Sequence, residues 1–188
     1  MHRKTSFLLC VLLSFTFIAA NLNNCFAERQ KSTVLLLINN TAHSKHDKKL
    51  NTLMQETLHK KIDVIYHEEN PGKFVENFYG KEQSKLSLDE MLAKLSGSTA
   101  DYLVYVELKA LDKDSDFNLI YYSKEVTATL FVRLIDMKNE KELYRDEFTM
   151  TSKDTTDYFF IGSGSVSKKA LNSALFKAGE IISCHLPL

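Results

Sequence analysis

Cysteine is scarce in this sequence, and its distribution leaves little room for disulfide bonds. Of the three cysteines, Cys10 and Cys25 lie in an N-terminal segment, and only Cys184 lies in the remainder of the chain. A domain with a single cysteine has no internal disulfide and depends on its hydrophobic core for stability. We expect Cys184 to be a small, buried apolar residue at the end of the last helix, with pairing between two chains as the alternative.

An excess of charge is also missing, because 24 Lys and Arg residues balance 24 Asp and Glu residues. The chain has no basic stripe, which argues against nucleic acid as a partner, and it has no long run of like charge. It contains only two prolines, no internal repeat and no low-complexity segment, while 44% of its residues are hydrophobic. These features are typical of a compact folded domain and not of a disordered chain.

The chain begins with the pattern of a secretory signal. The basic start MHRK is followed by an apolar run from residue 7 to residue 20, and then by the triplet CFA at residues 25–27. The small residues Cys25 and Ala27 predict cleavage after Ala27. The apolar run is shorter than the ~20 residues that a membrane-spanning helix needs. An uncleaved membrane anchor and lipid attachment at Cys25 are the alternatives to cleavage.

Cleavage after Ala27 leaves 161 residues, which is the size of one ordinary domain. We therefore predict a signal peptide at residues 1–27 and a single secreted α/β domain at residues 28–188. This domain is expected outside the cell, or in the periplasm and cell envelope. The removed segment carries two basic residues and no acidic ones, so the mature domain has a net charge of −2.

The periodicity of the apolar residues predicts the element order β-α-β-α-β-β-β-α. Alternation with a period of two indicates strands, and spacings of three and four indicate helices. The strands are expected at residues 31–39, 63–67, 102–111, 126–135 and 141–151, and the helices of this order at about 44–62, 87–96 and 166–184. Residues 74–79 suggest one further short helix, and residues 112–116 a polar turn. These elements predict a single α/β domain with a mixed sheet, on which the amphipathic C-terminal helix packs.

The most regular segment is VTATLFVRLIDMKNEKELYRDEFTM, residues 126–150. Its apolar residues alternate, stop at a short turn and alternate again, as in a β-hairpin. In that turn Asn139 is the residue best able to adopt a positive φ angle. Elsewhere, two capping boxes mark helix starts: Ser44 with Asp47 and Ser87 with Glu90.

Three segments carry a resemblance to a known family: ADYLVYVELKAL, the hairpin above, and KKALNSALFKAGEII. The strand that begins ADY, the strand that leads into LIDMKNEKEL and the Ala-rich last helix resemble the small α/β envelope domain of CsgG, of the TolB N-terminal region and of LpoB, an activator of penicillin-binding proteins. The resemblance covers most of residues 32–183. It implies a bacterial envelope protein that binds other proteins, as an assembly factor, activator or secretion subunit, and is not an enzyme.

An acidic segment has the start of a calcium-binding pattern. Asp112, Asp114 and Asp116 match the opening of a calcium loop. Phe117 and Ser123 stand where an EF-hand has glycine and glutamate, so we expect a solvated turn instead.

Other familiar catalytic and metal-binding patterns are incomplete. His43 and His46 lie three residues apart, but a zinc site needs three or four ligands and no further cluster is visible. Ser163 lacks the first glycine of the G-x-S-x-G pattern, and we expect Ser165 to cap the last helix. We therefore expect no catalytic residue, no metal site and no cofactor.

Aromatic residues in two loops are the main candidates for binding residues. They are Tyr121, Tyr122, Tyr158, Phe159 and Phe160. Loops seldom carry so many apolar residues without burying them, so these residues either close over the protein's own core or form a patch for a partner.

Three functions remain open from the sequence. The first is a non-enzymatic accessory or assembly protein, secreted or in the cell envelope, that acts by binding another envelope protein. The second is a periplasmic or extracellular protein that binds a small molecule or peptide, in a groove beside the hairpin or at an exposed sheet edge. The third is a hydrolase whose site is assembled from residues far apart in the sequence.

Overall fold

The structure, a computed structural model, describes residues 32–187 except for 45–46, 118–121 and 157–162. The chain divides into two units, Met1–Lys31 and Ser32–Leu188, and the described residues belong to the second. The elements are β1 (Thr33–Asn40), α2 (Asp47–Asp63), β2 (His67–Glu69), the 3₁₀ turn η1 (Pro71–Lys73), α3 (Val75–Phe78), α4 (Leu88–Lys94), β3 (Tyr102–Phe117), β4 (Tyr122–Asp136), β5 (Lys141–Thr156) and α5 (Ser163–His185). The predicted α/β class and the predicted order of elements are confirmed.

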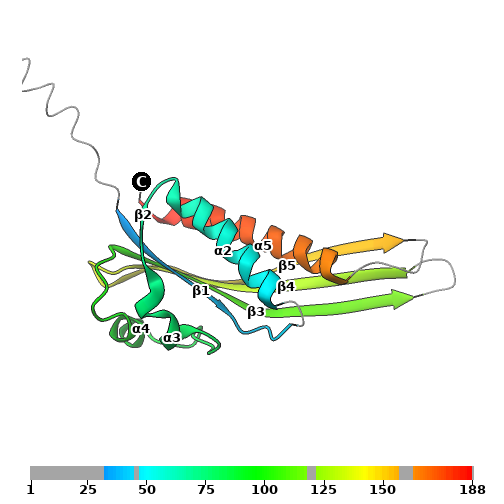
Figure 1. Cartoon of the computed structure of the whole chain (residues 1–188), viewed down its shortest axis with the longest axis horizontal. Coiled ribbons are helices and arrows are strands. Elements are labelled where there is room, and N and C mark those ends of the chain that lie inside the picture. Colours follow the sequence, from blue (N-terminus) through cyan, green and yellow to red (C-terminus); the bar gives the residue numbers. More distant parts are fainter. Residues whose placement is uncertain (1–31, 45–46, 118–121, 157–162, 188) are drawn as a thin grey trace, which may run out of the picture. The chain divides into compact units, whose positions relative to one another are not determined.

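The strands form one mixed sheet in the order β2-β1-β3-β4-β5. β1 pairs in parallel with β2 and β3, whereas β3, β4 and β5 pair antiparallel. The helix α2 is the crossover that the parallel pair of β1 and β2 requires. The predicted hairpin is β4 and β5, with Val132 opposite Asp146. Figure 1 shows β3, β4 and β5 continuing past the end of β1, whose pairing with β3 stops at Leu108.

Helices cover both faces of the sheet, with α2 and α5 on one face and α3 and α4 on the other (Figure 1). The alternation of β1 shows how the chain supplies both cores. Val34 and Leu36 pack under α2 and α5, while Leu35 and Leu37 pack against the opposite layer. Because β1 is covered on both faces, its sequence is a continuous apolar run, as expected.

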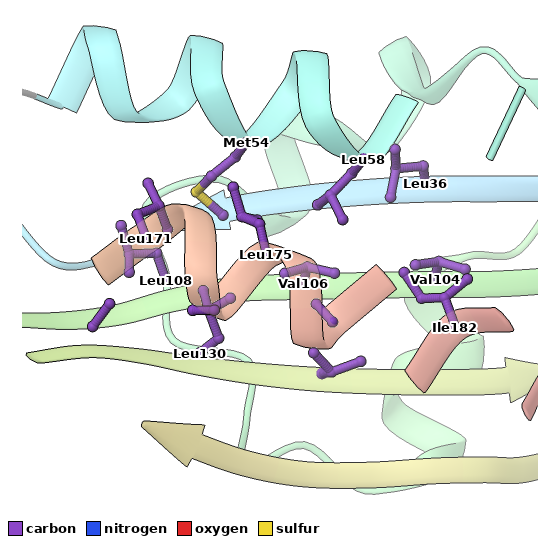
Figure 2. Packing of buried hydrophobic residues seen from close by; sticks show 14 of the residues in the cluster. Leu36, Met54, Leu58, Val104, Val106, Leu108, Leu130, Leu171, Leu175 and Ile182 are labelled. Atoms are coloured by element: carbon purple, nitrogen blue, oxygen red, sulfur yellow. The ribbon is translucent and has the colours of Figure 1, made fainter. Parts of the chain in front are cut away.

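The larger core lies between the sheet and the helices α2 and α5. Apolar residues four apart form the buried stripe of α2: Leu50, Met54, Leu58 and Ile62. Figure 2 shows side chains of α2 and α5 meeting over the strands, with Leu171 and Leu175 close to Leu108 and Leu130. The predicted packing of the C-terminal helix on the sheet is thereby confirmed.

Local capping fixes the start of α4 and orders the chain before α2. The Ser87 hydroxyl accepts from the Glu90 N–H at 3.3 Å, and the Glu90 carboxylate accepts from the Ser87 N–H at 2.8 Å, which confirms this capping box. Before α2, the Ser44 N–H donates to the Asp47 side chain at 2.7 Å. After α4, Gly97 has a φ of +91°, a conformation that favours glycine.

The second predicted strand is present as β2, but its predicted bounds, residues 63–67, are wrong. α2 continues to Asp63, and the N–H groups of Ile65 and Tyr66 donate back to the Ile62 carbonyl, so that β2 begins only at His67. The apolar residues that suggested a strand here belong to a turn after α2, in which Tyr66 is buried. Its hydroxyl donates to the Pro187 carbonyl at 2.9 Å, which ties the turn to the C-terminus.

The polar turn predicted at residues 112–116 is also wrong. These residues extend β3, and each pairs with a residue of β4, for example Asp114 with Glu125. The ladder continues to Phe117 opposite Tyr122, so the chain reverses later than its polar composition suggests. Backbone pairing with a long neighbouring strand outweighs the low strand propensity of aspartate here.

Two predicted positions are shifted by a few residues. α5 begins at Ser163, so Ser165 lies in its first turn and is not its cap. The predicted boundary came from the apolar stripe of the helix, which starts only at Val166. A helix can begin before its first buried residue, so the stripe does not mark the start of α5. In the turn between β4 and β5 the positive φ, 49°, belongs to Glu140, because Asn139 instead donates its N–H to the preceding aspartate.

Cys184 is exposed, which corrects the expectation of a buried thiol. The buried stripe at the end of α5 passes through Ile182 and Leu186. Cys184 lies two positions from each of them, which places it on the opposite side of the helix. Pairing of this thiol with a second chain stays a prediction.

Candidate functional site

The outer edge of β1 is paired with β2 only along its first half. The register ends with Leu35 opposite Glu69, and Asn70 and Pro71 follow β2. Proline has no backbone N–H, so the ladder cannot continue through Pro71. Residues 36–40 of β1 therefore present an edge against which no strand of the described chain lies.

Backbone groups of alternate β1 residues point to opposite edges of the strand. The Ser32 carbonyl accepts from His67 on the β2 side at 3.0 Å, whereas the Thr41 N–H donates to the β3 side at 2.9 Å. By this alternation the C=O of Leu36 and the N–H and C=O of Ile38 point to the open edge. The pairing of β1 with β2 ends before these three groups, and no turn or loop hydrogen bond of the described residues reaches them. Such unpaired groups are a template for a further strand.

A groove of about 120 Å³ runs along this open edge, and we call it the β1 groove. Its α2 wall is polar and consists of Asn51, Gln55 and His59, which lie one helical turn apart. Its other wall is apolar and comes from η1, α3 and the residue after α3: Pro71, Val75, Phe78 and Tyr79. A cavity of ~150 Å³ holds one benzene molecule, so the β1 groove accommodates roughly one side chain at its deepest part.

One polar contact joins the two walls of the β1 groove, and another holds His59 of its α2 wall against β2. At one end Asn51 Nδ2 donates to the Tyr79 hydroxyl at 3.3 Å, and Asn51 Oδ1 accepts from Asn40 at 2.7 Å. At the other end His59 Nδ1 lies 2.6 Å from a Glu68 carboxylate oxygen. Tyr79 is 56% exposed, so water competes for its long hydrogen bond and that end is readily opened.

A buried polar network fixes the chain that follows the apolar wall. Asn39 accepts from the Gly80 N–H at 2.9 Å and donates to the Lys81 carbonyl at 2.8 Å. Gly80 has a φ of +69°, which lets the chain turn directly after the wall. The Tyr105 hydroxyl accepts from Asn39 at 3.0 Å and donates to Glu107 at 2.7 Å. Burial first, and the charge of Glu107 second, raise the pKa of Tyr105, so its hydroxyl stays a donor.

Glu107 is the centre of this network and is fully buried. Its carboxyl oxygens accept from the Thr41 hydroxyl at 3.0 Å, from the Tyr105 hydroxyl at 2.7 Å and from the Gln83 N–H at 3.2 Å. Three donors from separate segments thus converge on one side chain. This satisfies a polar group that would otherwise be costly to bury.

Two arginines hold the loop that leads to α4. The side chain of Arg133 is fully buried, and it donates to Glu142 at 2.6 Å and to the Leu86 carbonyl at 2.8 Å. Its Nη2 is buried with no hydrogen-bond partner in the described part of the chain. Burial lowers the pKa of Arg133, and Glu142 opposes that shift. Arg145 donates to the Ser84 carbonyl at 2.7 Å.

Of the aromatic residues proposed from the sequence, only Tyr122 is described. It is half-buried at the start of β4, where it pairs with Phe117 and Thr156. Tyr121, Tyr158, Phe159 and Phe160 lie outside the described residues. The aromatic patch therefore stays a prediction.

Sequence reasoning missed the polar wall of the β1 groove. Asn51, Gln55 and His59 recur every fourth residue on α2, beside the apolar stripe that faces the core. A regular stripe of polar side chains next to a buried apolar stripe is the signal that was available. The stripe on α2 gave no indication that α3 forms the opposite wall, because α3 is too short for its sequence to show a helical period.

The described residues offer little for catalysis. None of them form a group of three or more His, Cys, Asp and Glu side chains able to hold a metal ion. His59 and Glu68 resemble the base and orienting acid of a hydrolase, but no Ser, Thr or Cys lines the β1 groove beside them. Asp112 and Asp114 lie along an extended strand and not in an ion-binding loop.

A second depression of about 540 Å³ lies on the outer surface of α2 near the start of α5. It is lined mostly by exposed, charged side chains, among them Lys48, Lys49 and Lys168. Sites that bind small molecules are lined mostly by apolar side chains with a few convergent polar groups. The charged lining of this depression does not fit that description. In the described residues no helix is long and apolar enough to cross a membrane.

No known family matches the sequence, and no curated protein sequence matches it. Solved structures that resemble it include lipoprotein GNA1162 from Neisseria meningitidis, at 14% identity over 81% of this chain and 99% of that one, with a TM-score of 0.42. The hypothetical protein CT253 from Chlamydia trachomatis has 14% identity over 79% and 96%, with a TM-score of 0.46. Rare lipoprotein B from Shewanella oneidensis has 11% identity over 80% and 94%, with a TM-score of 0.40.

Identities and scores this low give no information on what the protein binds. Bacterial lipoproteins are among the structures that resemble the chain. The resemblance to CsgG, the TolB N-terminal domain and LpoB stays a prediction.

Proposed function

We propose that this protein is a non-enzymatic accessory or assembly protein, secreted or held in the cell envelope, that acts by binding another protein. The open edge of β1 within the walled β1 groove carries the proposal. It offers unpaired backbone groups beside one polar and one apolar wall, an arrangement suited to a segment of another chain. The signal pattern at residues 1–27 supports an exported protein.

The size of the β1 groove favours a protein partner over a free small molecule. Pockets that enclose a drug-sized ligand measure about 300–1,000 Å³, whereas this groove measures about 120 Å³. A protein partner needs only one anchoring side chain at such a place, because the rest of its interface lies on the surrounding surface. In the alternative function, peptide binding, the segment in the groove is a free peptide and not part of a folded partner.

Site-specific photocrosslinking in the intact cell envelope tests this function. A photoreactive amino acid at Gln55, on the polar wall, is expected to capture one saturable partner. The same amino acid at Thr52 is the matched control, because Thr52 lies on α2 one turn away, is exposed and lines the other depression. Absence of any captured protein at Gln55, or equal capture at both positions, would contradict binding through the β1 groove.

The aromatic residues give a second candidate surface for the same function. Placing the photoreactive amino acid at Tyr122 in the same experiment shows whether that region also contacts the partner. Capture at Tyr122 but not at Gln55 would assign the interface to the aromatic patch. The accessory function would then stand with a different surface.

A further inference from the structure

We infer that the β1 groove binds an extended peptide segment of the partner, which adds to the open part of β1 as a further strand. This inference rests on the proposed function and specifies the chemistry of the bound segment. The C=O of Leu36 and the N–H and C=O of Ile38 are the groups that an added strand would pair with.

The alternative binding modes fit the groove less well. A helix has no free backbone groups along its side. A bound helix would therefore exclude water from the Ile38 N–H and C=O without giving them a hydrogen-bond partner. An extended chain instead supplies one N–H and one C=O to this edge at every second residue. The open edge spans residues 36–40, or about 13 Å at ~3.3 Å per residue, which corresponds to a bound segment of roughly five residues.

The two walls predict the side-chain pattern of the segment. Successive side chains of a strand point to opposite faces, so one set of side chains in the segment meets α2 and the other meets α3. Gln55 and His59 offer hydrogen-bonding groups to the first set, while Val75 and Phe78 offer an apolar contact to the second. The segment therefore alternates hydrogen-bonding and apolar residues, with one apolar side chain seated in the groove.

Under the proposed function the segment belongs to the partner chain. It approaches the open edge of β1 from solvent, where Gln55 on one wall and Tyr79 on the other are exposed.

Selection with a phage-displayed library of random heptapeptides tests the inference on the exported protein. Enriched peptides are expected to alternate polar and apolar residues. A synthetic peptide of that sequence should lose affinity about tenfold or more when every second backbone amide is N-methylated, because those amides face β1. N-methylation of the intervening amides should leave the affinity within about twofold.

Two variants locate the binding. Gln55→Trp fills the groove from the exposed side of α2 and should abolish peptide binding, whereas the control Thr52→Trp should retain it. Unchanged thermal unfolding of both variants shows that they fold. No enrichment, an equal effect of the two N-methylated sets, or full binding by Gln55→Trp would each overturn strand addition.

The failure of this inference is distinguishable from failure of the proposed function. If the crosslinker at Gln55 captures a partner while N-methylation has no alternating effect, the partner binds the groove without adding a strand. If peptides bind with the alternating effect but no partner is captured in the envelope, strand addition stands and the envelope function is wrong.

Discussion

Replacing Arg133 with alanine is expected to lower the free energy of unfolding by about 3–5 kcal/mol. Arg133 is among the largest fully buried side chains of the described residues, so its truncation leaves a cavity beneath the loop before α4. The change also removes the donor to the Leu86 carbonyl at 2.8 Å and the partner of Glu142 at 2.6 Å. A half-buried carbonyl and a half-buried carboxylate are then left without their partner.

Urea denaturation followed by circular dichroism measures this effect. The matched control is Arg145→Ala, because Arg145 also donates to a carbonyl of this loop but is exposed, and its loss should cost about 1 kcal/mol or less. Arg133→Met should cost less than Arg133→Ala, since it fills the space and removes the Nη2 group that lacks a partner. A loss of under about 1 kcal/mol in Arg133→Ala would show that this contact does not hold the loop.

Glu107→Ala is expected to destabilise the domain by about 3–5 kcal/mol and to loosen the chain behind the β1 groove. Glu107 is fully buried, and the change leaves the Tyr105 hydroxyl and the Gln83 N–H without an acceptor. The Thr41 hydroxyl loses its bond to Glu107 and keeps only the longer one to the Leu108 carbonyl, at 3.3 Å. Gln83 belongs to the loop that begins at Gly80 and Lys81, which Asn39 holds by two hydrogen bonds. Without the bond from Gln83 to Glu107, this loop should open more often.

Limited trypsin digestion reports the loosening separately from global stability. Lys81 and Lys85 are exposed in the loop, and cleavage after them should be faster in Glu107→Ala than in the parent protein. Glu107→Gln keeps one acceptor oxygen and should show a smaller change. Glu147→Ala is the matched control, because this half-exposed residue only pairs with Lys109 at the surface. Equal digestion rates for Glu107→Ala and Glu147→Ala would contradict the role given to the network.

The parts of the fold that the sequence predicted are those set by local or strongly periodic signals. The alternation predicted for β4 and β5 is confirmed because each apolar residue faces one of two covered layers. The Ser87–Glu90 capping box fixed the start of α4 because its hydrogen bonds lie within four residues. The apolar stripe of α2 was visible for the same reason.

The errors occur where distant partners decide the structure. Residues 112–116 are polar enough for a turn, yet pairing with β4 keeps them extended. Tyr66 belongs to a turn because its hydroxyl bonds to the distant Pro187. The β1 groove is invisible in the sequence since it depends on where β2 stops and on α3 lying opposite α2. No local pattern records either fact.

Amide hydrogen exchange at Ile38 tests most directly the claim that β1 has an open, strand-binding edge. The Leu37 N–H points to β3 and should be protected in the free protein, whereas the Ile38 N–H should exchange rapidly. On binding of the captured partner segment, the Ile38 amide should become protected and the Leu37 amide should stay so. Strong protection of Ile38 in the free protein, or none after binding, would contradict the account.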